Sequence, residues 1–313
     1  MATIAQNISR IQTAKADLKT AIEAKGVTVP SATTIDGYAT LVGQIQTGGG
    51  GGTDYSQQYL TFKSMDGGDI SCYFTRNGFG GQSGDLYWSS DGGTTWNQYG
   101  FSYQEEIGGS GCTEVILKGD LTNYDIIGDM YNPEGIGTFT FNYGYGDKII
   151  IEGNIMSLVA GDNFVGEDDL TTYSTSHLFI DLFHDNANAR FIIYADNLIL
   201  PAMTLIPHCY AYMFSNCEKL MTAPELPAIY EVTDCYDHMF AYCYNLRHIK
   251  MLLKTSIYNP TNYWLEGLDN VFNNGYLVGI MELNQNNGYI QTGTSGVPQN
   301  WERIDVYVPT PNA

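Results

Sequence analysis

The first 47 residues carry apolar side chains at helical spacing. Isoleucine and leucine recur in alternating steps of four and three residues, as they do on the seam of a coiled coil. One lysine interrupts the seam, which is typical of an oligomer whose register a polar layer sets. The pattern predicts an N-terminal helical, coiled-coil-like module for docking or oligomerisation, whereas an amphipathic helix packing on its own domain is the alternative. The seam consists of Ile4, Ile8, Ile11, Lys15, Leu18 and Ile22.

Alternating strand-like patterns follow a run of glycines. Residues 48–53 begin with five consecutive glycines, which predict a flexible linker. Residues 54–155 then show period-two segments separated by Gly and Asp, and these predict an all-β sandwich. Between two such segments, Ser89 to Trp96 matches S-x-D-x-G-x-x-W, the Asp-box hairpin. We expect Asp91 to bond turn amides, glycine to take positive φ and Trp96 to pack beneath.

A duplication dominates residues 156–313. Leu-Pro-Ala, Cys-Tyr, Met-Phe, Cys and Leu recur at an offset of 26 residues, beginning at Leu200 and again at Leu226. A fixed period of this size predicts stacked repeats that bury a shared core. Within each repeat the apolar spacing predicts a helical face, from Pro207 and from Thr233 onward, so an α+β solenoid is expected. Repeat scaffolds of this kind present surfaces more often than catalytic pockets.

The matched cysteines of the repeats predict buried thiols. Cys209 and Cys217 recur as Cys235 and Cys243, with seven residues between the members of each pair. Zinc sites use closer pairs such as C-x2-C. We therefore expect core thiols and neither a metal ion nor a cofactor.

Charge narrows the classes of partner. The chain of 313 residues carries 34 acidic and 14 basic side chains, for a net charge of −20. Nucleic-acid binding needs cations to neutralise phosphates, so it is not expected. No segment has the length and hydropathy for membrane insertion, and the N-terminus lacks the pattern of a secretory signal.

Common catalytic spacings are not found in the sequence. It contains no G-x-S-x-G, H-E-x-x-H, C-x-x-C or phosphate-binding P-loop. Carboxylates are numerous enough that pairs occur by chance, so a glycosidase pair is not assigned. We expect a protein that is not an enzyme.

Two resemblances place these patterns in a biological setting. The repeats, with L-P-A and C-Y-x-x-M-F-x-x-C, resemble BspA-like leucine-rich repeats of bacterial surface proteins and of phage and prophage proteins from gut bacteria. Residues 8–38, from Ile8-Ser9-Arg10-Ile11 to Ile35-Asp36-Gly37-Tyr38, resemble a short module near the start of phage tail and fibre proteins. Together they imply an attachment module joined by glycines to outward-facing domains.

The resemblances imply a structural virion protein, a head or tail fibre or appendage subunit assembled in the host cytoplasm and exposed on the particle. We expect a homo-oligomer, a trimer, that contacts other virion proteins through residues 1–47 and a host-surface glycan or protein through its outer domains. Exposed aromatic side chains are the candidate ligand contacts. A bacterial cell-surface adhesin and a polysaccharide depolymerase are the alternatives. The candidate contacts are Tyr212, Tyr242 and Tyr244.

Overall fold

The computed structural model describes residues 15, 19, 54–76, 82–102, 105–123, 135–142, 148–184, 191–254, 261, 263–266, 279–285, 297 and 301–307. The chain divides into two compact units, Met1–Asp54 and Tyr55–Ala313. In the first unit, Lys15 has a helical backbone conformation and a partly buried side chain. The other residues of the predicted seam lie outside the described residues: Ile4, Ile8, Ile11, Leu18 and Ile22.

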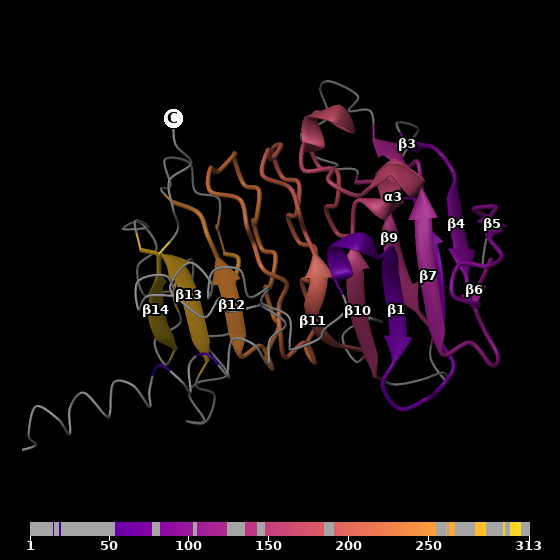
Figure 1. Ribbon diagram of the computed structural model, residues 1–313, viewed down its shortest axis with the longest axis horizontal. Helices are drawn as coiled ribbons and strands as arrows, with labels where there is room; N and C mark the ends of the chain where they lie inside the picture. Colours follow the sequence, from indigo (N-terminus) through magenta and orange to yellow (C-terminus); the bar gives the residue numbers. More distant parts are fainter. Residues whose placement is uncertain are drawn as a thin grey trace, which may run out of the picture. The chain divides into compact units, whose positions relative to one another are not determined.

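Strands make up most of the regular secondary structure in the described part of the second unit, and the α3 helix is only four residues long (Figure 1). Within the described residues, no helix is both long enough and apolar enough to cross a membrane. The elements, in chain order, are β1 (Leu60–Ser64), β2 (Ser71–Thr75), β3 (Gln82–Ser83), β4 (Leu86–Ser89), β5 (Asn97–Tyr99), β6 (Ile107–Gly108), β7 (Glu114–Gly119), β8 (Thr122–Asn123), β9 (Thr138–Phe141), β10 (Ile149–Asn154), α3 (Ser157–Ala160), β11 (Ile192–Ile199), β12 (His248–Met251), β13 (Ile280–Asn284) and β14 (Glu302–Val306), with short 3-10 turns at Tyr55–Gln57, Gly161–Asn163 and Leu170–Thr172.

One long layer of strands changes from antiparallel to parallel along its length. Its first part has the order β11-β10-β1-β7-β4-β5, in which β10 pairs antiparallel with β1 and parallel with β11. Parallel bridges from Tyr194 to Thr222 and from Thr222 to His248 carry the layer to β12. The parallel strands β13 and β14 complete it.

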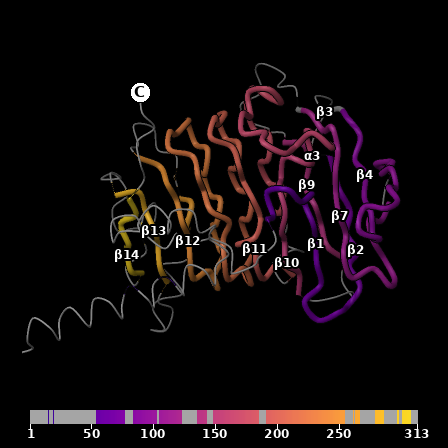
Figure 2. Tube along the Cα trace, in the orientation of Figure 1, coloured from indigo at the N-terminus to yellow at the C-terminus, as the bar shows by residue number. Residues whose placement is uncertain are grey.

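The second layer also runs from the sandwich into the repeats. Strands β6, β2 and β9 form its first part, and the ring of Phe62 on β1 packs edge-on against Phe139 and Phe141 on β9 at 5.1 Å. From β9 the layer continues to the segment that contains Leu182, because Phe139 N donates to Leu182 O at 2.9 Å. Leu182 belongs to what we call the turn stack, residues 177–183, 208–217, 234–243, 261 and 263–266. Figure 2 shows successive coils of this region side by side between β11 and β12.

The expected fold class is wrong. In its described residues the second unit is mostly β-sheet with one short helix, α3, and it has no helices in the repeats; the described residues of the first unit show no helical coiled-coil module. Instead of an α+β solenoid beside a sandwich, two hydrogen-bonded layers continue from one region into the other. One cluster of buried side chains accordingly extends from Leu60 to Trp301.

Backbone conformation explains why the repeats are not helical. His208, Tyr212 and Asn216 have φ of 55°, 56° and 64°, a left-handed conformation that interrupts a right-handed helix at every fourth residue. Between these positions Ala211 N donates to His208 O at 3.2 Å, closing a turn, while Tyr210 N donates to Cys235 O of the next coil at 3.0 Å. Amides thus alternate between bonds within a coil and bonds to the next coil.

The structure confirms the 26-residue offset, because matched residues of the two repeats lie on neighbouring coils and stack on each other. Tyr210 stacks on Tyr236 with ring centroids 6.0 Å apart, and Phe214 stacks on Phe240 at 5.8 Å. All four repeat cysteines are buried, as predicted, and burial raises the pKa of the Cys235 thiol to about 12. The repeats therefore build ladders of like side chains inside the turn stack.

Candidate functional site

The Asp-box hairpin between β4 and β5 folds as predicted. Asp91 Oδ1 accepts from Thr95 N at 2.9 Å and from the Ser89 hydroxyl at 2.7 Å, and Gly93 has a φ of 83°. These hydrogen bonds, that from the Thr95 amide foremost, lower the pKa of Asp91 to about 2. The closed turn fixes Trp96, whose ring packs edge-on against Tyr59 at 5.3 Å.

The α3 helix lies against the same sheet because Ser157 bonds two strands. Its hydroxyl donates to Leu117 O on β7 at 2.9 Å and accepts from Leu60 N on β1 at 2.9 Å. Both bonds are buried, where an unpaired hydroxyl or amide would be costly. Ser157 thereby holds α3 and the Gly161–Asn163 turn beside β7.

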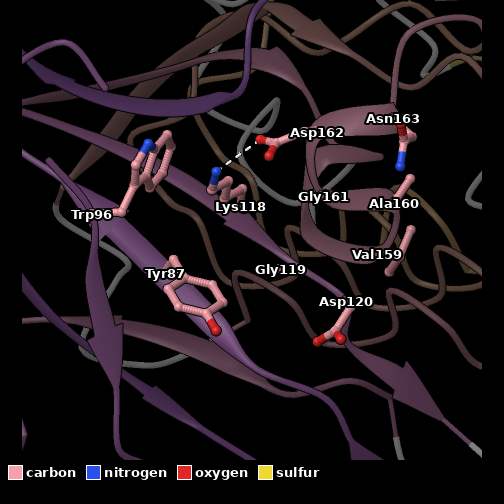
Figure 3. Close-up of a pocket in the computed structure, with 10 residues that line it drawn as sticks. All are labelled: Tyr87, Trp96, Lys118, Gly119, Asp120, Val159, Ala160, Gly161, Asp162 and Asn163. Carbon is pink, nitrogen blue, oxygen red and sulfur yellow. Dashed lines mark hydrogen bonds and ion pairs between the residues drawn. The ribbon is translucent and has the colours of Figure 1, made fainter. Parts of the chain in front are cut away.

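A cleft of about 450 Å³ lies between the hairpin and this helical turn. Figure 3 shows Tyr87 and Trp96 on one side, Val159, Ala160 and Asn163 on the other, and Lys118 and Asp162 facing each other. This volume is in the range of small-ligand sites, about 300–1,000 Å³. The cleft combines aromatic rings with a few polar groups. Its lining consists of Tyr87, Trp96, Lys118, Gly119, Asp120, Val159, Ala160, Gly161, Asp162 and Asn163.

Lys118 and Asp162 form the polar centre of the cleft. The Lys118 ammonium donates to Asp162 Oδ1 at 2.8 Å, and the Tyr59 hydroxyl donates to the same oxygen at 2.8 Å. The ammonium also lies 4.2 Å from the centroid of the Trp96 ring, within cation–π range. The hydrogen bonds, first that from Lys118, lower the pKa of Asp162. Burial, together with the bond to Asp162, raises the pKa of Tyr59 to about 12, so Tyr59 stays a donor at neutral pH.

The second carboxylate of the cleft, Asp120, has a structural partner. Its Oδ1 accepts from Asp85 N at 2.5 Å at the start of β4, and the Tyr87 hydroxyl bonds the Asp85 carboxylate at 3.3 Å. Asp85 and Asp120 thus tie the aromatic wall to the end of β7. In the part of the lining that the structure describes, the charged groups are one ammonium and two carboxylates.

This arrangement suits the binding of a flat, hydroxyl-rich molecule. Aromatic rings present apolar surface to the C–H faces of a sugar, while an ammonium and a carboxylate offer a donor and an acceptor to its hydroxyl groups. Asp162 is well exposed, at 64% of its side chain, whereas Lys118 is exposed at 18%. A ligand can therefore reach Asp162 directly and Lys118 from within the cleft.

Of the tyrosines predicted to bind ligand, Tyr212 and Tyr242 lie in the turn stack and Tyr244 directly follows its 234–243 segment; none of the three lines the cleft. Tyr212 stacks on His238 with centroids 4.5 Å apart and is tilted against His184 at 6.3 Å. Tyr242 and Tyr244 meet edge to face at 6.3 Å, and a bond to Glu266 raises the pKa of Tyr242. The structure brings Tyr242 and Tyr244 together, while the ring of Tyr212 contacts imidazoles. All three are partly buried.

Sequence reasoning singled out only Trp96 among the residues that shape the cleft, through the Asp-box pattern. Lys118 and Asp162 are 44 residues apart, and neither belongs to a recognisable spacing. Asp162 and Asn163 follow directly on α3, where a short Gly-Asp-Asn turn signals a surface loop. Nothing in that turn indicates which strand it faces.

Within the described residues, no group of three or more His, Cys, Asp or Glu side chains is placed to hold a metal ion. Comparisons with protein-family models, with curated proteins and with solved structures found no match.

Proposed function

We propose that this chain is a non-catalytic structural protein of a bacteriophage virion, a head or tail fibre or appendage subunit that attaches the particle to its host by binding a surface glycan. The observation that carries the binding part is the cleft, in which Tyr87 and Trp96 lie beside the Lys118–Asp162 pair. Sugar sites combine apolar ring surface with a few converging polar groups in this way. The virion part is supported by the sequence resemblances.

A single shallow site is sufficient for this role. Weak contacts repeated over several chains and several appendages give useful attachment through avidity. Residues 1–47 are the proposed contact with other virion proteins, in a trimer whose outer units face the host. Light scattering of the full chain and of a chain starting at Thr53 tests this: the account expects a trimer that becomes a monomer on truncation.

Glycan binding is tested with the full chain on an array of bacterial surface polysaccharides. Tyr87→Ala is expected to lower affinity for any glycan bound by about tenfold or more, because it removes ring surface from the cleft. Tyr230→Ala is the matched control, since Tyr230 is a surface tyrosine, 61% exposed, that does not line the cleft. An equal loss of glycan affinity in Tyr87→Ala and Tyr230→Ala would contradict the proposal. So would a failure of the unmodified chain to bind any glycan.

One observation favours a depolymerase as second candidate. Asp120 and Asp162 both line the cleft, and glycosidases use two carboxylates beside the bond they cleave. A general acid needs a raised pKa, whereas hydrogen bonds from Lys118 and Tyr59 lower the pKa of Asp162. Binding is therefore the better-supported function. Release of reducing ends from a bound polysaccharide, abolished by Asp162→Asn while binding persists, would instead establish hydrolysis.

A further inference from the structure

The charges of the cleft indicate what kind of glycan it accepts, an inference that rests on the proposed function. Among the described residues that line the cleft, Lys118 is the one basic residue, and Asp162 Oδ1 already accepts a hydrogen bond from it. Asp120 adds a second carboxylate to the lining. The ammonium is therefore paired inside the site, and the described residues of the lining together carry one excess negative charge. An anionic ligand would meet like charge without an unpaired cation to offset it.

The Lys118–Asp162 pair presents a donor and an acceptor side by side. Asp162 Oδ1 accepts from both Lys118 and Tyr59, at 2.8 Å each, and its other carboxylate oxygen has acceptor capacity to spare. The Lys118 ammonium has three hydrogens, of which the bond to Asp162 uses one. Two adjacent hydroxyl groups can therefore bind here together, one accepting from Lys118 and the other donating to Asp162.

The aromatic side of the cleft favours a ligand that has an apolar face of its own. Lys118 lies over the Trp96 ring at 4.2 Å, so part of that ring already faces a cation, and Tyr87 supplies further ring surface. Pyranose rings combine an apolar C–H face with adjacent hydroxyl groups at the rim, which matches this division of the cleft. We infer that the site selects a neutral saccharide with adjacent hydroxyl groups and rejects uronic and sialic acids.

The test is a glycan array that carries neutral oligosaccharides together with uronic-acid-containing and sialylated ones, probed with the full chain. Neutral glycans are expected to be bound at least about tenfold more tightly than acidic glycans of similar size. Preferential binding of acidic glycans would overturn the inference while leaving the proposed glycan binding intact. Absence of binding to every glycan would overturn both.

A charge variant tests whether the cleft causes this selectivity. In Asp120→Asn/Asp162→Asn both carboxylates become neutral amides of similar shape, which still accept hydrogen bonds from Asp85 N, Lys118 and Tyr59. The preference for neutral over acidic glycans is expected to fall by about tenfold. Asp162→Asn alone is the second variant, should the double variant fold poorly, and is expected to show a smaller change in the same direction.

Asp168→Asn is the matched control, because Asp168 is exposed and does not line the cleft. It is expected to keep the selectivity of the unmodified chain. An unchanged preference in both cleft variants would overturn the inference, as would an equal change in the Asp168→Asn control.

Discussion

The sandwich and the turn stack bury their aromatic side chains in different ways. In the sandwich, rings meet mostly edge to face, as Phe62 does with Phe139 at 84° between ring planes. In the turn stack, like residues of successive coils lie nearly parallel, as Tyr210 and Tyr236 do at 7°. Partly buried rings of the turn stack are also nearly parallel, since the rings of Tyr212 and His238 lie 8° from parallel.

This difference determines where ring faces remain open to a ligand. Stacking along the repeats places His238 on one face of the Tyr212 ring at 4.5 Å, and His184 is tilted against the ring at 6.3 Å, so less of this ring is open to a ligand. The hairpin of the sandwich instead places Trp96 and Tyr87 at the wall of a cleft. The turn stack is thus the scaffold in this account, and the sandwich carries the binding site.

The largest expected effect concerns the shared core. Phe214 is fully buried between Phe183 and Phe240, so Phe214→Ala should lower the free energy of unfolding by about 3–5 kcal/mol. Because the two layers continue from sandwich to stack, urea unfolding should remain a single transition. Tryptophan fluorescence and far-ultraviolet circular dichroism should shift together. Two separate transitions, with only one moved by the substitution, would show that the regions are independent.

Next in size is the loss of binding on removal of a cleft ring. Trp96→Ala should weaken glycan binding by about tenfold or more, which corresponds to about 1.4 kcal/mol. Tyr212→Ala should leave it unchanged, because Tyr212 belongs to the scaffold. Titration calorimetry with one bound oligosaccharide measures both. A larger loss of affinity in Tyr212→Ala than in Trp96→Ala would indicate that the glycan binds at the turn stack.

A third prediction concerns the left-handed positions of the stack. Asn216 has a φ of 64°, so Asn216→Gly should be more stable than Asn216→Ala by about 1 kcal/mol, since a Cβ is unfavourable there. Both variants lose the contacts of the Asn216 amide group. The difference between their free energies of unfolding therefore reports the preference of the backbone at this position. In a helix the order would be reversed. Urea unfolding of the pair decides between the two conformations.

The smallest effect is the acid sensitivity of the hairpin. The folded pKa of Asp91 is about 2, below the unfolded value of about 3.9. Its contribution is therefore fully present above about pH 4 and is lost as pH falls toward 2. Thermal unfolding of Asp91→Asn and of the unmodified chain should converge over that range. A gap between Asp91→Asn and the unmodified chain that stays constant over this pH range would contradict the assignment.

The sequence predicted the ladders of the repeats but not their backbone. A fixed offset forces like residues to stack, whatever the conformation of each coil, and the structure has Phe214 on Phe240. The helical prediction failed because Cys209, Met213 and Cys217 recur every four residues, a spacing that serves four-residue turns as well as helices. Six of the nine described left-handed positions of the turn stack are His, Asn or Asp and the other three are Tyr. Asn, Asp and His are the residues that tolerate this conformation best.

The cleft could be predicted only at its hairpin. Asp91, Gly93 and Trp96 form a local motif whose hydrogen bonds span four residues or fewer, so the pattern sufficed. Lys118 meets Asp162 because α3 is held against the sheet, in part by the bonds of Ser157 to β7 and β1. That pairing depends on the order of strands in the sheet, which no short spacing encodes.

Amide hydrogen exchange of the full chain, with and without a saturating neutral oligosaccharide, tests most directly whether the sandwich carries the binding site and the turn stack is its scaffold. The account predicts slower exchange at Lys118 to Asp120 and at Gly161 to Asn163, with the turn stack at 208–217 and 234–243 unchanged. Protection confined to the turn stack would contradict the claim that the sandwich binds and the repeats support.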